Sequence, residues 1–177
     1  MRMFKVKLGK KKEIEKGIDL VSQVRKDLKK SDIAKTIASK YGLEDQFEDI
    51  IDGVAIYFND FAEDGMSDGV SARTTDGVVS LNNKLMDNID HIMEYVVHEF
   101  THVCQHIVNE GSAPKKHSGK YIEKPEELEA FHYQVQQIQE DKGDEESLQY
   151  IRDLLDYHKI KNPKKRKTLE RLLLKGE

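Results

Sequence analysis

A five-residue stretch, His-Glu-Phe-Thr-His at 98–102, constrains this chain more than any other feature. It is an H-E-x-x-H motif inside a run, 90–110, whose apolar residues recur at helical spacing. On a helix, residues four apart lie one turn apart on the same face, so His98 and His102 can bind one metal ion. Glu99 could then take a proton from a water molecule at that metal, as a general base. The run predicts a helix of about 20 residues, a length that indicates burial in a domain core.

The same spacing is compatible with a core helix whose histidines hydrogen-bond to their neighbours. A lone histidine would favour that interpretation. Two histidines in register with a glutamate instead favour a metal site. The run contains no glycine before Gly111, which is a natural C-terminal stop for a helix.

Charge and cysteine content indicate which partners and which cellular compartment to expect for this chain. A net charge of -4 gives no reason to expect binding to nucleic acid or to an anionic membrane. No apolar run is long enough to span a bilayer, and the first residues lack the apolar core of a signal peptide. The single cysteine, Cys104, cannot form an internal disulfide and is expected to be a small helix residue. We therefore expect a cytoplasmic protein.

The order of the predicted elements indicates one α+β domain over residues 1–177. The segment Val54–Phe58 is rich in residues that favour strands. Two further β-type runs, 70–73 and 78–82, flank an Asp-Gly pair at 76–77, which predicts a hairpin. We expect a small antiparallel or mixed sheet packed against the long motif helix, with a core at about residues 54–141.

Helices are predicted on both sides of this core, over residues 1–50 and 144–177. Residues 2–7 alternate weakly in hydropathy, which indicates a short strand before the first helix. Beyond them, apolar residues recur at helical spacing in five segments outside the motif helix. These segments are 11–29, 31–41, 126–141 after Pro125, 145–159, and the stretch that begins at Asn162-Pro163.

A catalytic zinc site takes three protein ligands and keeps one position open, so the motif needs a third ligand. His106 lies eight residues beyond His98, about 12 Å along the helix axis, and could share a metal with it only at full stretch. His117 lies in the polar loop after the helix. A carboxylate from the cluster after Pro125 is the third possibility, and the uninterrupted motif helix favours it. That cluster comprises Glu126, Glu127 and Glu129, which the dipole at a helix N-terminus would attract in any case.

The H-E-x-x-H motif followed by Glu127-Leu-Glu-Ala130 resembles the gluzincin class of zinc metallopeptidases, in which E-x-x-A follows on a second helix. The resemblance covers roughly residues 54–135. The small size is similar to that of minimal ImmA/IrrE-type regulatory peptidases and small phage-encoded peptidases. The metzincin pattern does not fit, because Gln105 stands where that pattern has a glycine. The sequence departs from the gluzincin pattern at Phe131, where many relatives have an Asp or Asn that orients a zinc-binding histidine.

This resemblance implies a zincin-like fold that binds one Zn²⁺ ion and hydrolyses peptide bonds. The implied ligands are His98, His102 and Glu127, with Glu129 as the next candidate and Glu126 after it. Glu99 would be the general base. Candidates for the donor that stabilises the developing oxyanion are His117, Tyr121 and Tyr133. The strand before the motif helix would form the edge of the sheet and bind an extended peptide through its backbone; its residues are Val78, Val79, Ser80, Leu81 and Asn82.

Two other functions remain compatible with the sequence. In the first, zinc stabilises a regulatory or binding module and Glu99 has no catalytic role. In the second, the chain is similar to SprT/Spartan-type peptidases, which act on proteins bound to nucleic acid, and His117 is the third ligand. The intact Glu99 argues against the first, and the acidic cluster with the negative net charge argues against the second. The expected partner is a peptide or protein substrate, whose identity the sequence does not indicate, and neither does it indicate an oligomeric state.

Overall fold

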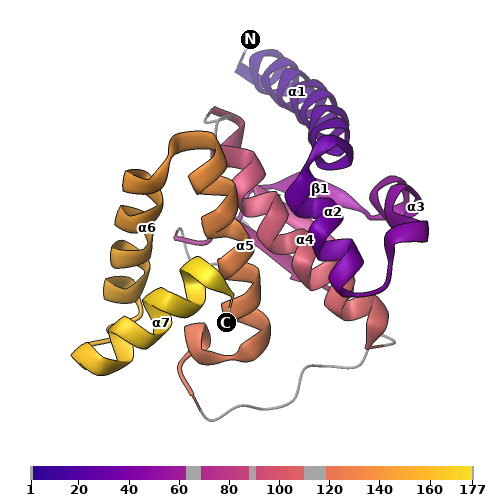
Figure 1. Ribbon diagram of the computed structural model, residues 1–177. Helices are drawn as coiled ribbons and strands as arrows, with labels where there is room; N and C mark the ends of the chain where they lie inside the picture. The colour runs from indigo at the N-terminus through magenta and orange to yellow at the C-terminus, as the bar shows by residue number, and fades with distance from the viewer. Residues whose placement is uncertain (1, 63–68, 88–90, 110–118, 177) are drawn as a thin grey trace.

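The computed structural model describes residues 2–62, 69–87, 91–109 and 119–176 (Figure 1). These residues form seven α-helices and one small mixed sheet, which confirms the predicted α+β class. Among them, no helix combines the length and the apolar character needed to cross a bilayer. The helices are α1 (Arg2–Lys30), α2 (Asp32–Lys40), α3 (Phe47–Gly53), α4 (Ile92–Val108), α5 (Pro125–Lys142), α6 (Asp144–Tyr157) and α7 (Pro163–Lys175), and the strands are β1 (Ile56–Asn59), β2 (Ala72–Thr75) and β3 (Val78–Asn82).

The helix boundaries follow local chemistry at most positions. Ser31 caps α2 by accepting a hydrogen bond at its Oγ from the backbone N–H of Ala34. Asn162 caps α7 in the same way, and proline occupies the first position of both α5 and α7. The predicted strand at residues 2–7 is wrong, because the helix already begins at Arg2. Arginine, methionine and lysine, which fill most of positions 2–7, favour helices, and this preference outweighs a weak alternation over a few residues.

The sheet is built around a tight hairpin. Strands β2 and β3 pair antiparallel, with Thr75 opposite Val78. Both turn residues adopt positive φ angles, 51° at Asp76 and 76° at Gly77, as a two-residue type I′ turn requires. The hairpin predicted from Asp-Gly is therefore confirmed.

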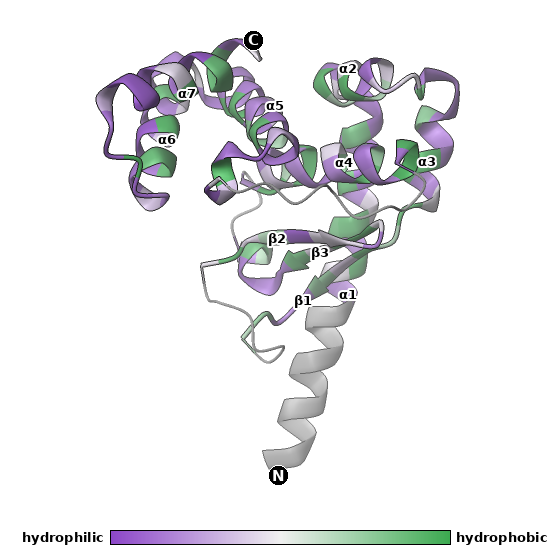
Figure 2. Cartoon of the chain, turned by 90° about the horizontal axis from the view of Figure 1, so that it is seen from below, coloured by the Kyte–Doolittle hydropathy of each residue, from purple (hydrophilic) through white to green (hydrophobic). Residues whose placement is uncertain are grey.

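The predicted edge strand is wrong. Strand β1 pairs parallel to β3, with Ile56 opposite Val79, and the strand order is β1-β3-β2. Val78–Asn82 is thus the central strand, with both of its edges paired. Alternation along a strand shows which side chains face the core, but it does not show which strands lie on either side. Among the described strands, the edges are β1 and β2, and it is β2 that lies beside α4 (Figure 2).

Two apolar clusters hold the helices in place. The first surrounds α4, where Phe100 packs edge-on against Phe47 of α3 with ring centroids 6.1 Å apart. Helices α1 and α2 and the sheet contribute to the same cluster. The second cluster joins α5, α6 and α7 and includes Val135, Ile151 and Leu173. Helix α5 packs along α4 and contributes side chains to both clusters, so it links the two halves of the fold (Figure 1).

We predict that Gly77→Ala destabilises the protein by about 1–3 kcal/mol, the usual cost of a non-glycine residue in a strained backbone conformation. A Cβ atom at Gly77 would also lie 3.2 Å from the His106 ring. The matched control is Gly53→Ala at the end of α3, where a Cβ meets no heavy atom within 4 Å. Urea denaturation should show a lower midpoint for Gly77→Ala only. Equal midpoints for the two variants would contradict the assigned turn.

Candidate metal centre

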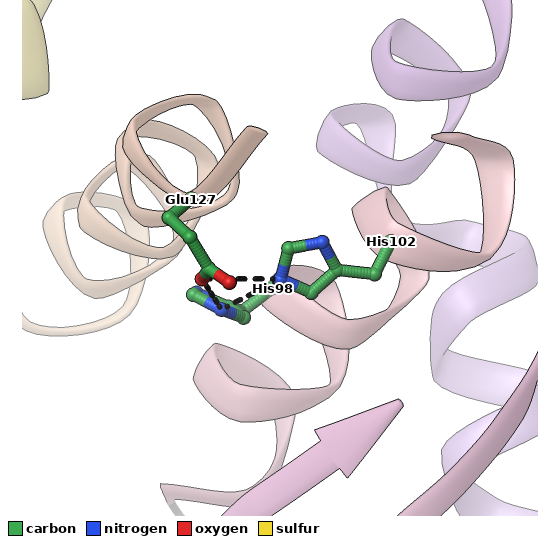
Figure 3. A group of neighbouring side chains, drawn as sticks. All are labelled: His98, His102 and Glu127. Atoms are coloured by element: carbon green, nitrogen blue, oxygen red, sulfur yellow. Dashed lines mark hydrogen bonds and ion pairs between the residues drawn. The ribbon is translucent and has the colours of Figure 1, made fainter. Parts of the chain in front are cut away.

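Three side chains meet between α4 and α5 (Figure 3). His98 and His102 lie one turn apart on the face of α4 that α5 covers, and Glu127 comes from the first turn of α5. The two Nε2 atoms are 3.2 Å apart. Glu127 Oε2 lies 3.7 Å from Nε2 of His98 and 3.4 Å from Nε2 of His102. The third side chain expected from the sequence therefore reaches the two histidines.

These distances suit a tetrahedral zinc site. Ligand atoms 2.0–2.1 Å from a zinc ion are separated from one another by about 3.3 Å in a tetrahedron. The three separations lie close to this value. In addition, Glu127 Oε2 is buried and accepts no hydrogen bond within the described part of the chain. A buried carboxylate oxygen without a donor is costly, and a cation would satisfy it. The three residues therefore suit the zinc ion that the H-E-x-x-H motif predicts.

The other glutamates of the cluster after Pro125 do not join the metal-binding group. Residues 127 and 129 point about 200° apart around a helix, so they cannot both face His98 and His102. The Glu129 carboxylate instead lies toward α2, where it accepts a hydrogen bond from Tyr41 Oη at 2.5 Å and forms an ion pair with Lys40. Within the described ranges, neither Glu126 nor Glu129 belongs to the metal-binding group.

His106 does not complete the group. It lies beside the turn of the β2–β3 hairpin, against Gly77, rather than with His98 and His102. His117 lies outside the described residues. Among the residues that the structure describes, the group that could hold a metal ion is His98, His102 and Glu127.

Glu99 is buried and is held by the sheet. Thr74 of β2 donates a hydrogen bond from its Oγ1 to Glu99 Oε2 at 2.7 Å. The contact ties the carboxylate beside His98 to the edge strand that runs along α4. No motif marks Thr74 in the sequence. The one available signal is a polar residue at a half-buried position of β2, where an apolar residue would be usual.

The two tyrosines proposed as donors have different surroundings. The Tyr121 ring lies edge-on to Phe131, which packs against His98, so Tyr121 lies near the metal-binding group although the residue is 46% exposed. Partial burial of the phenol, together with the charge of Glu127, raises its pKa well above the usual value. The Tyr121 ring stacks on the ring of His158, with the centroids 5.8 Å apart. His158 follows α6, and no motif marks it in the sequence. Tyr133 is only 4% exposed and belongs to the core around α4, with Lys40 Nζ 6.0 Å from its ring centroid. The structure thus brings Tyr121, and not Tyr133, to the site.

The two histidines differ at the nitrogen atoms that face away from Glu127. His102 Nδ1 lies 2.8 Å from Gln105 Oε1. His98 Nδ1 is buried and has no hydrogen-bond partner in the described structure. The ring of Phe131 packs against the His98 ring instead, with centroids 4.5 Å apart at 67°. Phe131, where the gluzincin pattern has a polar residue, therefore supplies packing in place of a hydrogen bond.

Without metal, the group behaves as a buried ion pair. Burial lowers the pKa of His102, but the Glu127 carboxylate outweighs this and raises it to about 9. Burial raises the pKa of Glu127, but the neighbouring His102 and His98 rings lower it to about 2. Each group therefore stabilises the charged form of the other.

No protein-family model matches the chain, and neither a curated protein nor a solved structure does. The functional assignment therefore depends on the sequence motif and on the arrangement of the side chains.

In the metal-free protein, we expect the His102 ring to titrate near pH 9. Its raised pKa stabilises the fold fully below about pH 6.5, the ordinary pKa of a histidine, and this contribution is lost as the pH rises through 9. The depressed pKa of Glu127 stabilises the fold above pH 4.5, and this contribution is lost as the pH falls toward 2. Glu127→Gln should lower the His102 pKa, because burial lowers this pKa and the carboxylate charge that outweighs it is then removed. NMR titration of the imidazole protons measures the change; an unchanged pKa in the variant would refute the pairing.

Proposed function

We propose that this chain is a zinc-dependent metallopeptidase of the gluzincin class. The observation that supports the proposal best is the convergence of His98 Nε2, His102 Nε2 and Glu127 Oε2 at separations of 3.2–3.7 Å. Sequence and geometry point to the same residues, since the spacing of the motif and the packing of α4 on α5 both select them. A buried glutamate adjacent to the first histidine supports a catalytic site over a purely structural zinc site, which would not need it.

When bound, zinc would act as a Lewis acid that polarises the scissile carbonyl. It would also lower the pKa of the water bound to it to ~7. Glu99 then takes the proton from the attacking water and transfers it to the leaving amine. Thr74 orients the Glu99 carboxylate by donating to one of its two oxygens, so we assign the proton transfer to the other oxygen. Tyr121 is the residue that we assign as second donor to the developing oxyanion, because its phenol lies close to Glu127.

Strand β2 replaces β3 as the proposed substrate-binding strand. It pairs with β3 along one edge only, among the strands described, and its Thr74 contacts the proposed general base. An extended peptide that added to the outer edge of Ala72–Thr75 would place its backbone beside Glu99. Backbone pairing carries little sequence information, so this mode of binding suits a range of peptide and protein substrates.

We expect the purified protein to contain about one zinc ion per chain. Glu127→Ala should weaken zinc binding by more than about 100-fold, since the loss of a ligand exceeds the 10–100-fold cost of losing an outer-shell partner. Metal analysis and competition with a chelator measure the two quantities. His117→Ala is the matched variant and should bind zinc like the wild type. The reverse result, with zinc lost in His117→Ala and retained in Glu127→Ala, would show that the gluzincin assignment is wrong.

Glu99→Gln should keep its zinc and lose proteolysis by about 10²–10⁴-fold, the usual contribution of a general base. Hydrolysis of casein-like proteins and of a mixed peptide library provides the readout. Glu140→Gln, at an exposed position near the end of α5, controls for the loss of one negative charge. If zinc binds but neither the wild type nor Glu140→Gln cleaves any substrate, the metal would have a structural role instead.

A further inference from the structure

We propose that Glu129 is a positioning residue for the metal centre and acts on the ring of His102 through the side-chain amide of Gln105. The inference rests on the proposed zinc site and assigns roles to residues that are not ligands. It gives Glu129, which the sequence suggested as a ligand, a different role at the same site.

Three side chains form a continuous path of hydrogen bonds away from the metal-binding group. His102 Nδ1 lies 2.8 Å from Gln105 Oε1, and Gln105 Nε2 lies 3.1 Å from Glu129 Oε2. Gln105 is one turn beyond His102 on α4 and is buried against α5. The path therefore crosses from α4 to α5 inside the packed interface of the two helices.

The surroundings of Gln105 fix the orientation of its amide. Its Nε2 atom lies within 3.1 Å of two acceptors, the Glu129 carboxylate and the backbone carbonyl of Glu126. Both donors of the NH₂ group are then engaged, so the amide oxygen must be the atom that faces His102. With the amide reversed, its oxygen would face a carboxylate and a carbonyl, which are acceptors too.

The fixed amide determines the tautomer of His102. An amide oxygen can only accept, so His102 Nδ1 must carry the proton of the bond between them. The lone pair of the neutral ring is then on Nε2, the atom that faces Glu127. A metal ligand needs this tautomer, and a hydrogen bond at the opposite nitrogen also restricts rotation of the ring.

Helix α2 anchors the far end of the path. Tyr41 Oη donates to the same Glu129 oxygen that receives the Gln105 amide, and Lys40 pairs with the other oxygen. The Glu129 side chain therefore has little freedom to leave the amide. Because Tyr41 and Lys40 lie outside the motif region, the N-terminal part of the chain takes part in building the metal centre.

The surroundings of His98 show what the hydrogen bond to Gln105 adds at His102. His98 Nδ1 has no hydrogen-bond partner among the described residues, and the ring is held by packing against Phe131. Packing restricts a ring but does not select its tautomer. Within the described structure, His102 is the one of the two histidines whose Nδ1 meets an acceptor that makes this selection.

The test uses the full chain with Glu129→Gln, which keeps the shape of the side chain and removes its charge. A neutral amide no longer requires Gln105 to present its NH₂ group, so zinc affinity should fall by about 10-fold or more. The absorption bands of the Co²⁺-substituted protein should shift as well, because they report ligand geometry rather than activity. Gln105→Met is the second variant; it keeps the volume but provides no acceptor for His102, and it should lose affinity to a similar extent.

Lys142→Met is the matched control. It removes an ion pair with Glu94 that also joins α5 to α4 but is not part of the path, so it should lower the melting temperature without changing zinc affinity or the Co²⁺ spectrum. If Glu129→Gln or Gln105→Met binds zinc as tightly as Lys142→Met and the wild type do, the path is structural only and the proposal fails while the zinc site stands. If the wild type binds no zinc, the proposed function and this inference fail together.

Discussion

The packing of α5 against α4 is the contact on which the rest of the structure depends. Two histidines come from one helix and the carboxylate from the other, so the site exists only where the two helices meet. Bringing three polar groups into a buried interface is unfavourable unless they satisfy one another or bind a cation. Apolar packing on both sides offsets this cost. Phe100 and Val103 face the core around α4, while Val135 and Leu155 belong to the core beyond α5.

The sequence allowed the locally encoded parts of the fold and site to be predicted. Histidines at i and i+4 define one helix face, proline marks the start of α5, and Asp-Gly specifies the hairpin. Each of these signals operates within a few residues. The parallel pairing of β1 with β3 does not, because it joins segments more than 20 residues apart and leaves β2 as the edge. Helical geometry likewise shows that Glu127 and Glu129 face different directions, but the packing of α4 and α2 decides which of them meets the histidines.

The residues that support the ligands were the hardest to predict. Thr74, Gln105 and Tyr41 are common polar residues that belong to no motif, and each acquires its role from an element distant in the sequence. The same is true of His158, which reaches Tyr121 because α6 ends beside the start of α5. Ligands follow a spacing rule because a metal imposes one. Their supporting residues need only the right hydrogen-bonding atom at the right place, which many sequences and many elements can provide.

Because the core is divided into two clusters, a bound metal ion would also affect the stability of the fold. The histidines belong to the helix that organises one cluster, and Glu127 belongs to the helix that anchors the other, 25 residues after His102 (127 − 102). The proposed metal ion would act as a reversible cross-link between two separately packed halves and would close the loop between them. Its binding free energy would then add to the folding free energy. The lifetime of the folded chain in a cell would therefore follow the supply of the metal, so that scarcity would remove the protein itself and not only its activity.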